Sequence, residues 1–388
     1  MIGKCREVFE QKFGEGGEIR GYFSPGRVNL IGEHTDYNGG HVFPCALTIG
    51  TYGVARRRTD RKLRLYSMNF EQTGVVETSL DELEPCAETL WTRYVKGVIW
   101  AFARKGKPIE TGFDFLCLGT IPNGSGLSSS ASLEVLTGTV LKDLYGFEES
   151  MKEVALYSQL AENQYVGVNC GIMDQFAIAM GKKDHAIFLD TATLAYTYVP
   201  VKLDGARIVI GNTNKKRGLG DSKYNERRGE CETALREIGS VKQAASLGAL
   251  SEAEFEEVQT AIADPIRRRR ARHAVTENQR TIQAVEALSQ GDLEAFGRLM
   301  NDSHVSLRDD YEVTGVELDT LVEAAWKQPG VIGARMTGAG FGGCMVSIVR
   351  EENVESFVCR VGAVYREKIG YDADFYVVEI GDGPRVLF

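Results

Sequence analysis

The chain has 388 residues, a formal net charge of -9 and 43% hydrophobic residues. This length and composition are typical of a globular protein with one large or two ordinary domains and an extensive core. The acidic balance argues against a general binder of nucleic acid or of anionic membranes, and no apolar segment has the length of a membrane span or the character of a signal peptide.

Cysteine usage indicates the compartment. The eight cysteines stand singly along the chain, without a Cys-x-x-Cys pair. A large chain with no export signal does not need a disulfide framework. We therefore expect reduced thiols and a cytoplasmic location.

A cluster of polar residues marks the N-terminal segment. After an amphipathic helix predicted at residues 4–14, a short apolar strand, Val28–Ile31, is flanked by glycines. Four functional side chains crowd around this strand: Arg27, Glu33, His34 and Asp36. Carboxylates accept hydrogen bonds from sugar hydroxyls, and an imidazole can donate or accept one. The cluster favours a site for a polyhydroxylated ligand; a metal site, an acid–base site and a solvated turn are the alternatives.

Residues 47–79 are predicted to form β-strands with basic turns, at Arg56 to Arg58 and at Arg61. Because the whole chain is acidic, we interpret these arginines as a solvated sheet edge rather than a nucleic-acid patch. A helix with apolar residues on one face is predicted next, at residues 91–105.

Residues 119–134 combine a glycine- and serine-rich loop with the start of a helix. An apolar strand, Phe113–Leu118, precedes the loop, and an amphipathic helix that ends at Gly146 follows it. Glycines let backbone N–H groups converge, the helix N-terminus adds the positive end of its dipole, and three consecutive serines, 128–130, add further donors. This pattern predicts a polyphosphate site, as in a nucleotide-binding protein, although no Gly-Lys-Ser/Thr closes the loop as in a Walker A motif. A capping turn without a ligand is the alternative.

Two carboxylates follow in helical segments. A helix predicted at residues 150–166 carries Glu162, and a short helix at 172–180 carries Asp174 near its beginning. An aspartate in a first turn usually serves only as a favourable charge near the helix dipole, so this pattern alone assigns no function.

The second half of the chain is predicted to begin after residue 198, which divides it into domains 1–198 and 199–388. A loop at residues 214–224 leads into a helix, and helical periodicity dominates residues 252–328. The arginines at 267–270 and 272 could suggest RNA binding, but no basic domain or aromatic platform accompanies them.

A glycine fingerprint lies near the C-terminus. Gly338, Gly340 and Gly343 satisfy the spacing Gly-x-Gly-x-x-Gly. A β-rich run, Cys344–Val349, follows where a dinucleotide-binding site requires a helix, so the sequence argues against such a site.

Three motifs resemble those of a known kinase superfamily. Gly26-Arg-Val-Asn-Leu-Ile-Gly-Glu-His-Thr-Asp-Tyr37 resembles the signature of the galactokinases. Residues 122–131 resemble the second motif, and residues 335–344 the third, of the GHMP kinases, which comprise the galactokinases and the homoserine, mevalonate and phosphomevalonate kinases. Ser125 stands for a common alanine and Ala339 for a common glycine, both small changes. The motifs occur in order, so the resemblance covers essentially the whole chain.

The resemblance implies an α+β fold of two domains with mixed β-sheets and helices, and an active site in the inter-domain cleft. It implies a galactokinase activity, in which the γ-phosphoryl group of ATP moves to the anomeric hydroxyl of α-D-galactose. The products would be α-D-galactose 1-phosphate and ADP, in the first committed step of galactose catabolism. ATP would be the co-substrate and Mg²⁺ the cofactor. We expect galactose and ATP as partners, no nucleic acid or membrane, and a monomer.

The resemblance also assigns roles to residues. Asp174 would be the catalytic base, and Arg27 would orient it and offset charge in the transition state. Glu162 and Ser130, with Ser129 as the weaker choice, would hold Mg²⁺. The sugar would be bound by Glu33, His34, Thr35, Asp36 and Tyr224. The nucleotide would be bound by Ser67, Gly124, Ser125, Gly126, Leu127, Ser128, Ser129 and Ser130. The glycines of the third motif would let that loop pack against the phosphate loop.

Three other functions are alternatives. A kinase for a related sugar, such as N-acetylgalactosamine, would share the motifs. A galactose- and ATP-binding regulator without catalysis is opposed by the intact serine run and by Asp174. A nucleotide-binding structural protein is opposed by the polar cluster at residues 33–36.

Overall fold

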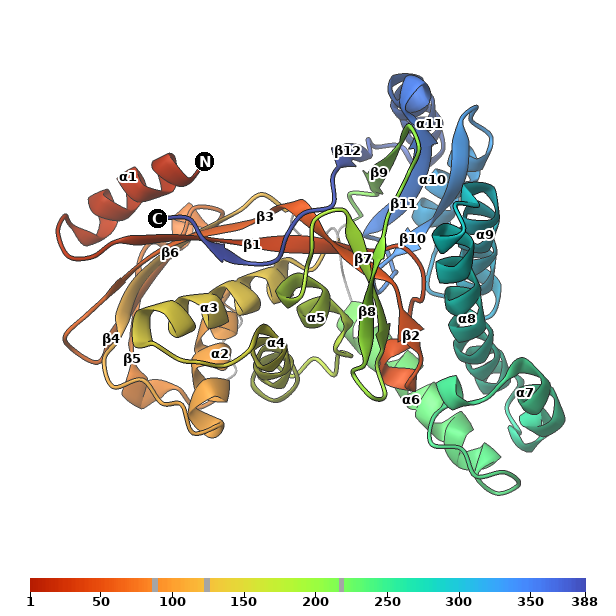
Figure 1. The fold of residues 1–388 in the computed structure, drawn as a ribbon, viewed down its shortest axis with the longest axis horizontal. Helices are drawn as coiled ribbons and strands as arrows, with labels where there is room; N and C mark the ends of the chain where they lie inside the picture. Colours follow the sequence, from red (N-terminus) through yellow and green to blue (C-terminus); the bar gives the residue numbers. More distant parts are fainter. Residues whose placement is uncertain (86–89, 122–125, 216–219) are drawn as a thin grey trace.

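The structure, a computed structural model, describes residues 1–85, 90–121, 126–215 and 220–388, without the side chains of residues 220–222. A six-stranded sheet in the order β13-β1-β3-β6-β4-β5 supports the N-terminal lobe (Figure 1). Its strands are β1 (Arg20–Asn29), β3 (Pro44–Arg57), β4 (Lys62–Ser67), β5 (Val76–Ser79), β6 (Phe113–Gly119) and β13 (Arg385–Val386). β4 and β6 are parallel and the other pairs antiparallel, which confirms the expected mixed sheet.

Helices cover both faces of this sheet (Figure 1). α1 (Ile2–Phe13) packs on one face through Cys5, Phe9 and Phe13. Four helices share a core with the other face: α2 (Thr92–Arg104), α3 (Ser129–Tyr145), α4 (Met151–Leu160) and α5 (Met173–Ala179). α3 is buried from Ala131 to Leu141, because it lies between the sheet and its neighbouring helices, and it ends at Gly146 as predicted.

The helix predicted at residues 150–166 is divided in two. α4 starts at a capping box made by Ser150 and Glu153 and ends at Leu160. The chain then continues as a π-helical turn, Ala161–Val166, which carries Glu162. Such turns are rare in proteins, and those that occur often lie at functional sites.

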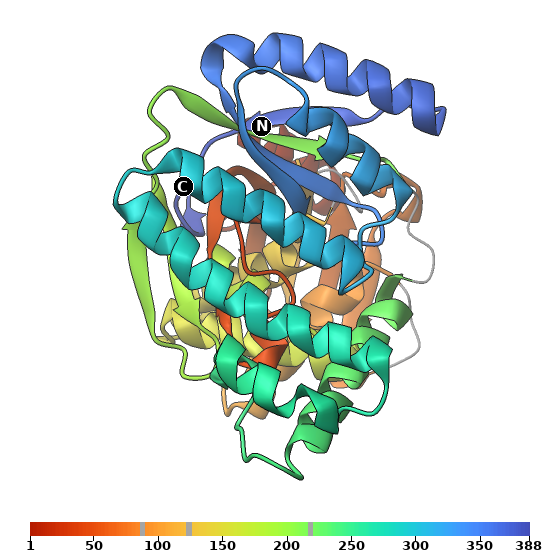
Figure 2. The same ribbon diagram turned by 90° about the vertical axis from the view of Figure 1, so that its right-hand side faces the viewer.

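A four-stranded antiparallel sheet in the order β10-β11-β9-β12 supports the C-terminal lobe. Its strands are β9 (Ala206–Asn212), β10 (Val331–Thr337), β11 (Cys344–Arg350) and β12 (Asp374–Val378). Successive residues of β9 face opposite sides. Ile208 and Ile210 pack with α8 (Pro265–Ser289) and α9 (Leu293–Asp309), and Val209 packs with α10 (Val316–Trp326) and α11 (Val354–Ile369). Figure 2 shows α8 and α9 side by side across this lobe, with α6 (Gly220–Ile238) and α7 (Glu252–Val258) near one end of α8.

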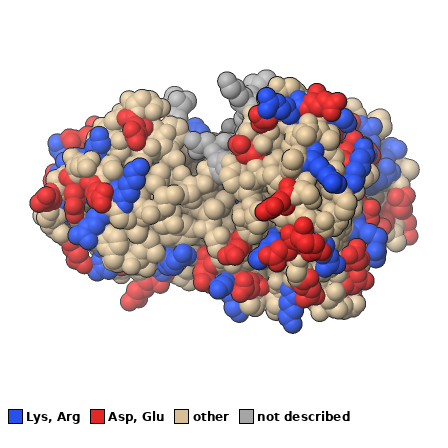
Figure 3. Space-filling view, turned by 90° about the horizontal axis from the view of Figure 1, so that it is seen from above, with Lys and Arg blue, Asp and Glu red and all other residues tan. Residues whose placement is uncertain are grey.

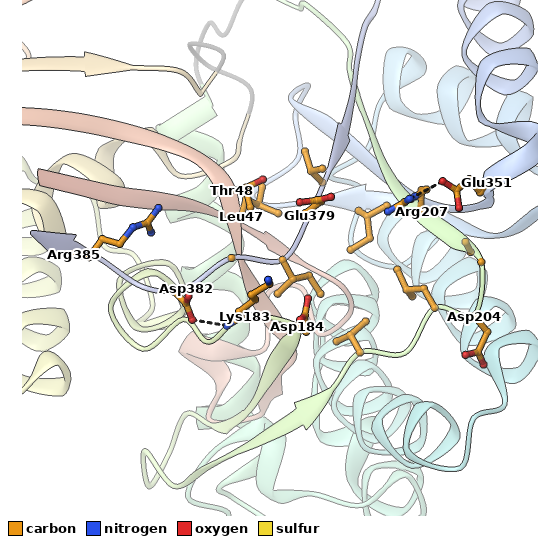
Figure 4. Close-up of a pocket in the computed structure, with 18 residues that line it drawn as sticks. Leu47, Thr48, Lys183, Asp184, Asp204, Arg207, Glu351, Glu379, Asp382 and Arg385 are labelled. Carbon is orange, nitrogen blue, oxygen red and sulfur yellow. Dashed lines mark hydrogen bonds and ion pairs between the residues drawn. The ribbon is translucent and has the colours of Figure 1, made fainter. Parts of the chain in front are cut away.

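The two lobes are joined by backbone contacts at more than one place. A third, small sheet, separate from these contacts, has three strands: β2 (His41–Val42), β7 (His185–Asp190) and β8 (Tyr196–Pro200). After β12 the chain returns to the first lobe: the Thr48 N–H donates to the Glu379 carbonyl at 3.0 Å, and β13 pairs with β1. A cavity of about 800 Å³ opens at this junction, lined by charged side chains from both lobes (Figure 4). The division at residue 198 stays a prediction.

The structure differs from the predicted elements where distant segments pair or pack. The strand predicted at Val28–Ile31 is the end of the longer β1, which stops at Asn29. The sequence did not predict β2, β8, β10 or β13. Tyr224, expected in a loop, lies in α6. Strand formation depends on the partner strand more than on the local sequence, which explains the missed strands.

Acidic and basic side chains are interspersed over the face seen in Figure 3. None of the described helices has the length and apolar character that a membrane crossing requires. The seven described cysteines are free thiols, as expected.

Candidate active site

A cavity of about 410 Å³ lies between the lobes. Most of the predicted site residues line it: Arg27, Glu33, His34, Asp36, Gly126, Ser128, Ser129, Ser130, Glu162, Asp174 and Tyr224. They come from β1 and the turn after it, the start of α3, the π-helical turn, α5 and α6. Segments that are distant in the sequence therefore converge on one cavity.

Asp174 is held by partners on both of its oxygens. The Arg27 Nε–H donates to Oδ1 at 2.8 Å, and the Ser128 hydroxyl donates to Oδ2 at 2.5 Å. Arg27 is buried in β1, beside a register shift in its pairing with β3, and it also donates to the Gly126 carbonyl at 2.7 Å. Burial lowers the pKa of Arg27, but Asp174 and Glu33 outweigh burial and raise it above its ordinary value. The arginine is therefore charged and links Asp174 to the loop before α3.

The N-terminus of α3 faces the cavity through its serines. Ser128 has a left-handed backbone with φ 61°, which is uncommon for a residue other than glycine. Its side chain does not cap α3 but points to Asp174. The first-turn N–H groups of α3 have no partners within the helix and are available to an anion. Gly124 and Ser125, predicted in the same loop, lie outside the described residues.

Asp36 lies beside the beginning of α5. It accepts hydrogen bonds from the backbone N–H groups of Tyr37 at 3.0 Å and Met173 at 3.4 Å. Burial, and then the charge of Asp174, raises the pKa of Asp36 to about 6. Gly171 lies against the Asp36 carboxylate. A Cβ at position 171 would lie 1.8 Å from Asp36 Oδ2, so this position accepts no side chain unless Asp36 moves.

Glu33 and His34 contact the third motif. Glu33 accepts hydrogen bonds from the Gly338 N–H at 2.8 Å and from Arg335 at 3.3 Å. Burial lowers the pKa of His34 to about 3, so its ring is neutral. Its Nε2 lies 3.2 Å from the Ala339 carbonyl, an acceptor, and must carry the proton; its Nδ1 then accepts from the Tyr37 hydroxyl at 2.7 Å. The Tyr224 ring lies 5.6 Å from the His34 ring.

The loop of the third motif packs against the loop before α3. Gly338 has φ 84°, and a Cβ at this position would lie 2.8 Å from the Gly126 carbonyl oxygen. That oxygen is the one that accepts from Arg27. The close approach of the two loops therefore depends on a glycine at 338.

Three models of known protein families match segments of this chain. Residues 7–57 match the galactokinase galactose-binding signature, residues 93–182 the N-terminal domain of GHMP kinases and residues 284–367 their C-terminal domain. The chain is 63% identical to a galactokinase of Clostridium acetobutylicum over 94% of each chain, and 56% identical to one of Ligilactobacillus salivarius over 98% of each. The chain belongs to the galactokinase family.

Solved structures extend the similarity to the fold. A Lactococcus lactis galactokinase complexed with galactose is 52% identical, with a TM-score of 0.98 over 100% of both chains. A mevalonate kinase, 18% identical, has a TM-score of 0.66 over 94% of this chain and 99% of its own, which reflects the fold alone. The galactokinase-family chain thus has the GHMP kinase fold that its sequence implied.

This galactokinase-family chain offers a carboxylate and a hydroxyl to a cation. Burial and the charge of Asp174 raise the pKa of Glu162 to about 7, and a hydrogen bond from Ser130 opposes the rise. Glu134 is fully buried, and burial and the charge of Glu162 raise its pKa. Mg²⁺ prefers oxygen ligands, takes one or two from protein and the rest from phosphates and water, so this donor set fits it. Within the described residues, no group of three His, Cys, Asp or Glu side chains makes a metal site by itself.

Three predicted residues do not line the cavity. Thr35 is fully buried and donates to the backbone carbonyls of Gly32 and His41, so it shapes the turn that carries Glu33 to Asp36. Leu127 packs into the core between the lobes. Ser67 ends β4 and accepts from the Asn69 N–H. Their predicted contacts with sugar and nucleotide stay predictions.

Two buried polar residues beside the site were not predicted. Gln175 and Glu134 are fully buried and hydrogen-bonded to each other. The available signal was an acid within an apolar helical stretch, Leu133 to Leu136, and a glutamine directly after Asp174. Neither signal separates a buried residue from an exposed one without the fold.

Proposed function

We propose that this chain transfers the γ-phosphoryl group of ATP to the anomeric hydroxyl of α-D-galactose and releases α-D-galactose 1-phosphate and ADP. The observation that carries the proposal is the position of Asp174. Its carboxylate lies in one cavity with the polar cluster of the sugar signature and with the serine-lined start of α3, and Arg27 and Ser128 hold it there.

Asp174 is the proposed base. A carboxylate is a weak base toward a sugar hydroxyl, so the proton moves late, as the bond between oxygen and phosphorus forms. Most of the catalytic effect then comes from positioning and from electrostatic stabilisation. Arg27 keeps Asp174 aligned through its hydrogen bond to Oδ1, and its charge offsets the negative charge that develops during transfer.

The start of α3 is the proposed phosphate site. Its free N–H groups and the hydroxyls of Ser128 and Ser129 would hold the ATP phosphates. Glu162 and Ser130 would hold Mg²⁺, which supplies positive charge to the phosphate oxygens when bound. Ser128 donates to Asp174 in the structure, so contact with phosphate would release one Asp174 oxygen for the sugar hydroxyl.

Asp36 and Tyr224 are the proposed main contacts for the sugar, on a frame made by Glu33 and His34. Both His34 nitrogens have partners within the protein, and the partner of Nε2 is a carbonyl of the third motif, which supports a role for His34 in holding that motif. Selectivity follows from burial, since a polar group left unpaired by the wrong sugar costs about 1–3 kcal/mol. The related Lactococcus lactis protein binds galactose, which supports the same ligand here.

The test is ADP release with a panel of sugars: galactose, N-acetylgalactosamine, 2-deoxygalactose and glucose. We expect galactose to give the highest kcat/KM. ADP release that is highest with N-acetylgalactosamine would point to the related-sugar kinase, and galactose binding without ADP release would point to a regulator. We also propose that the protein is cytoplasmic and that it is a monomer; sedimentation tests the monomer.

The base is tested by Asp174→Ala and Asp174→Asn. We expect kcat to fall by about 10³-fold or more in both variants, while galactose binding stays detectable by calorimetry. Near-normal kcat in either variant would show that Asp174 is not the base. For the sugar site, Asp36→Ala should weaken galactose more than ATP, and equal losses would remove Asp36 from that site.

A further inference from the structure

Gln175 joins the elements that carry the proposed catalytic groups. It is fully buried in α5, directly after Asp174. Its amide nitrogen donates to Glu134 in α3 at 3.1 Å and to Glu162 in the π-helical turn at 2.5 Å. A primary amide has two N–H groups, so one side chain can serve both carboxylates. Asp174, Glu162 and the serine-lined helix are thereby linked through one buried contact.

The burial of these polar groups costs free energy, which is unfavourable if the contact serves only to stabilise the fold. Two buried carboxyl groups face one amide, and Glu134 Oε1 and Gln175 Oε1 have no hydrogen-bonding partner among the described side chains and backbone. Apolar side chains of similar volume would pack in such a place at lower or equal cost. The polar character of this contact therefore points to a role in the site rather than in the core.

The contact also fixes which way Glu162 faces. Gln175 and the Cys170 thiol both donate to Glu162 Oε2, the thiol at 3.5 Å. A hydrogen bond from Ser130 reaches the same carboxyl group. The Glu162 carboxylate is thus held by the buried Gln175 and also meets the proposed cation partner, Ser130.

We infer that Gln175 is a positioning residue, anchored by Glu134, that sets the carboxylate of Glu162 for a divalent cation. The inference rests on the proposed cation site of Glu162 and Ser130. Partners of this kind behind a metal ligand typically change metal affinity by about 10–100-fold when they are removed.

The test uses Gln175→Met, which keeps the volume of the side chain and removes both N–H groups. Mn²⁺ binding in the presence of ADP is measured by electron paramagnetic resonance, and galactose binding is measured by calorimetry in metal-free buffer. We expect the Kd for Mn²⁺ to rise about tenfold or more, with the Kd for galactose changed by less than about twofold. Gln159→Met is the matched control, because the Gln159 amide in α4 donates to the Cys170 carbonyl and makes no described hydrogen bond to Glu162; the Mn²⁺ affinity of this variant should stay at the wild-type value.

Two substitutions of Glu134 distinguish a role as a hydrogen-bonding anchor for Gln175 from a direct effect of its charge. Glu134→Gln keeps an oxygen that accepts from Gln175, and we expect Mn²⁺ affinity within about threefold of wild type; Glu134→Leu removes the acceptor and should match Gln175→Met. Equal losses in Glu134→Gln and Glu134→Leu would overturn the anchor role, since the charge would then matter and not the hydrogen bond.

Two results would overturn the role of Gln175. One is an unchanged Mn²⁺ affinity in Gln175→Met, and the other is a parallel loss of Mn²⁺ and galactose binding, which would mean that the residue only maintains the core. If the wild-type protein itself failed to bind Mn²⁺ with ADP, the proposed cation site would be wrong, and that result is distinct from both.

Discussion

Asp36 is a partly buried carboxylate whose described hydrogen bonds come from backbone N–H groups, and Asp174 is close enough to repel it. Burial and this repulsion raise its pKa from 3.8 to about 6. Between about pH 4 and pH 6 the folded protein therefore holds a proton that the unfolded chain has released. The contribution of this group to the free energy of unfolding falls as pH rises through that window.

We predict that Asp36→Asn stabilises the ligand-free protein at pH 7.5 by about 1–2 kcal/mol, a value below the full effect of the shift because the side chain keeps some contact with solvent. The gain should be lost at about pH 3, where Asp36 is largely neutral in both states. Urea unfolding at the two pH values measures it, with Asp302→Asn, at an exposed position of α9, as the unchanged control. Lower stability of Asp36→Asn at pH 7.5 would contradict the prediction.

Gly338 tests the contact between the third motif and the loop before α3. We predict that Gly338→Ala raises the KM for ATP about tenfold, since the added Cβ meets the Gly126 carbonyl and the left-handed φ disfavours alanine by about 1 kcal/mol or more. Steady-state kinetics at saturating galactose measures this.

Gly370→Ala is the matched control for that change. Gly370 has φ 93° at the end of α11, but a Cβ there would meet nothing within 4 Å. It should lose stability of a similar size and keep the wild-type KM. A raised KM in both variants would assign the effect to backbone strain alone.

Residues whose role depends on local sequence could be predicted, and residues whose role depends on burial could not. Arg27 lies within the galactokinase signature, Glu162 and Asp174 were assigned by the family resemblance, and the cavity contains all three. Glu134 occupies a helical stretch whose periodicity does not say that both its faces are covered. Gln175 becomes informative only when α3 and the π-helical turn are seen on either side of it.

Among the elements, β3, β4 and β6 meet at Asp114, which is buried in β6. Arg56 in β3 and Arg64 in β4 lie opposite it in register, and Arg58 also donates to it. Arg56 further donates to backbone carbonyls at the end of α1 and directly after it. The interpretation of these arginines as a solvated edge was therefore wrong for Arg56 and Arg58, because their partner comes from a strand over fifty residues away.

We predict that Asp114→Asn lowers the free energy of unfolding by about 3 kcal/mol, since three guanidinium groups lose their buried counter-charge. Hydrogen bonds from Arg64, Arg56 and Arg58 outweigh burial and lower the pKa of Asp114, so this stabilisation is present at neutral pH and is lost as pH falls below about 4. Urea unfolding at pH 7.5 measures the loss, with kcat unchanged in folded protein.

Asp60→Asn is the control for that prediction. Asp60 also pairs with Arg58 but is exposed, and its removal should change stability little. A loss as large as that of Asp114→Asn would contradict the role of burial.

The arginine run of α8 shows the same dependence on tertiary partners. Arg267 pairs with Glu237, Arg269 with Glu312, and Arg270 with both Glu230 and Glu312. Arg268 donates to the Ile262 carbonyl and Arg272 to Gln259. The run therefore has acidic and backbone partners within its own lobe, which argues against RNA as its ligand.

At the scale of the whole molecule, the end of the chain connects the two lobes. β12 belongs to the C-terminal sheet and β13 to the N-terminal sheet, with the junction cavity of Figure 4 beside the segment between them. Helical periodicity and motifs predicted both lobes, but β13 spans two residues and pairs with a strand at the other end of the sequence. No local sequence pattern predicts such a strand.

We predict that deletion of residues 384–388 lowers the free energy of unfolding by about 1–3 kcal/mol, because it removes the hydrogen bonds between Gly21 and the backbone of residues 387–388 and the edge partner of β1. Galactose affinity should stay within about twofold of wild type, since the cavity is lined by other segments. Denaturant unfolding and calorimetry measure the two effects. Arg385→Ala, which removes a contact with the Phe23 ring and keeps the strand, should show a smaller loss; a loss equal to that of the deletion would assign the effect to this side chain.

The pairing of β13 with β1 also brings the two ends of the polypeptide together. The Arg6 guanidinium lies 5.6 Å from the centre of the Phe388 ring, and Figure 1 shows both termini at the same lobe. A short glycine linker from Phe388 to Met1 would therefore suit a circular permutant with new ends opened in the turn at Gly291, between α8 and α9. A fluorescent protein fused to one of these new ends would lie beside the C-terminal lobe, while the joined natural ends stay next to the first sheet.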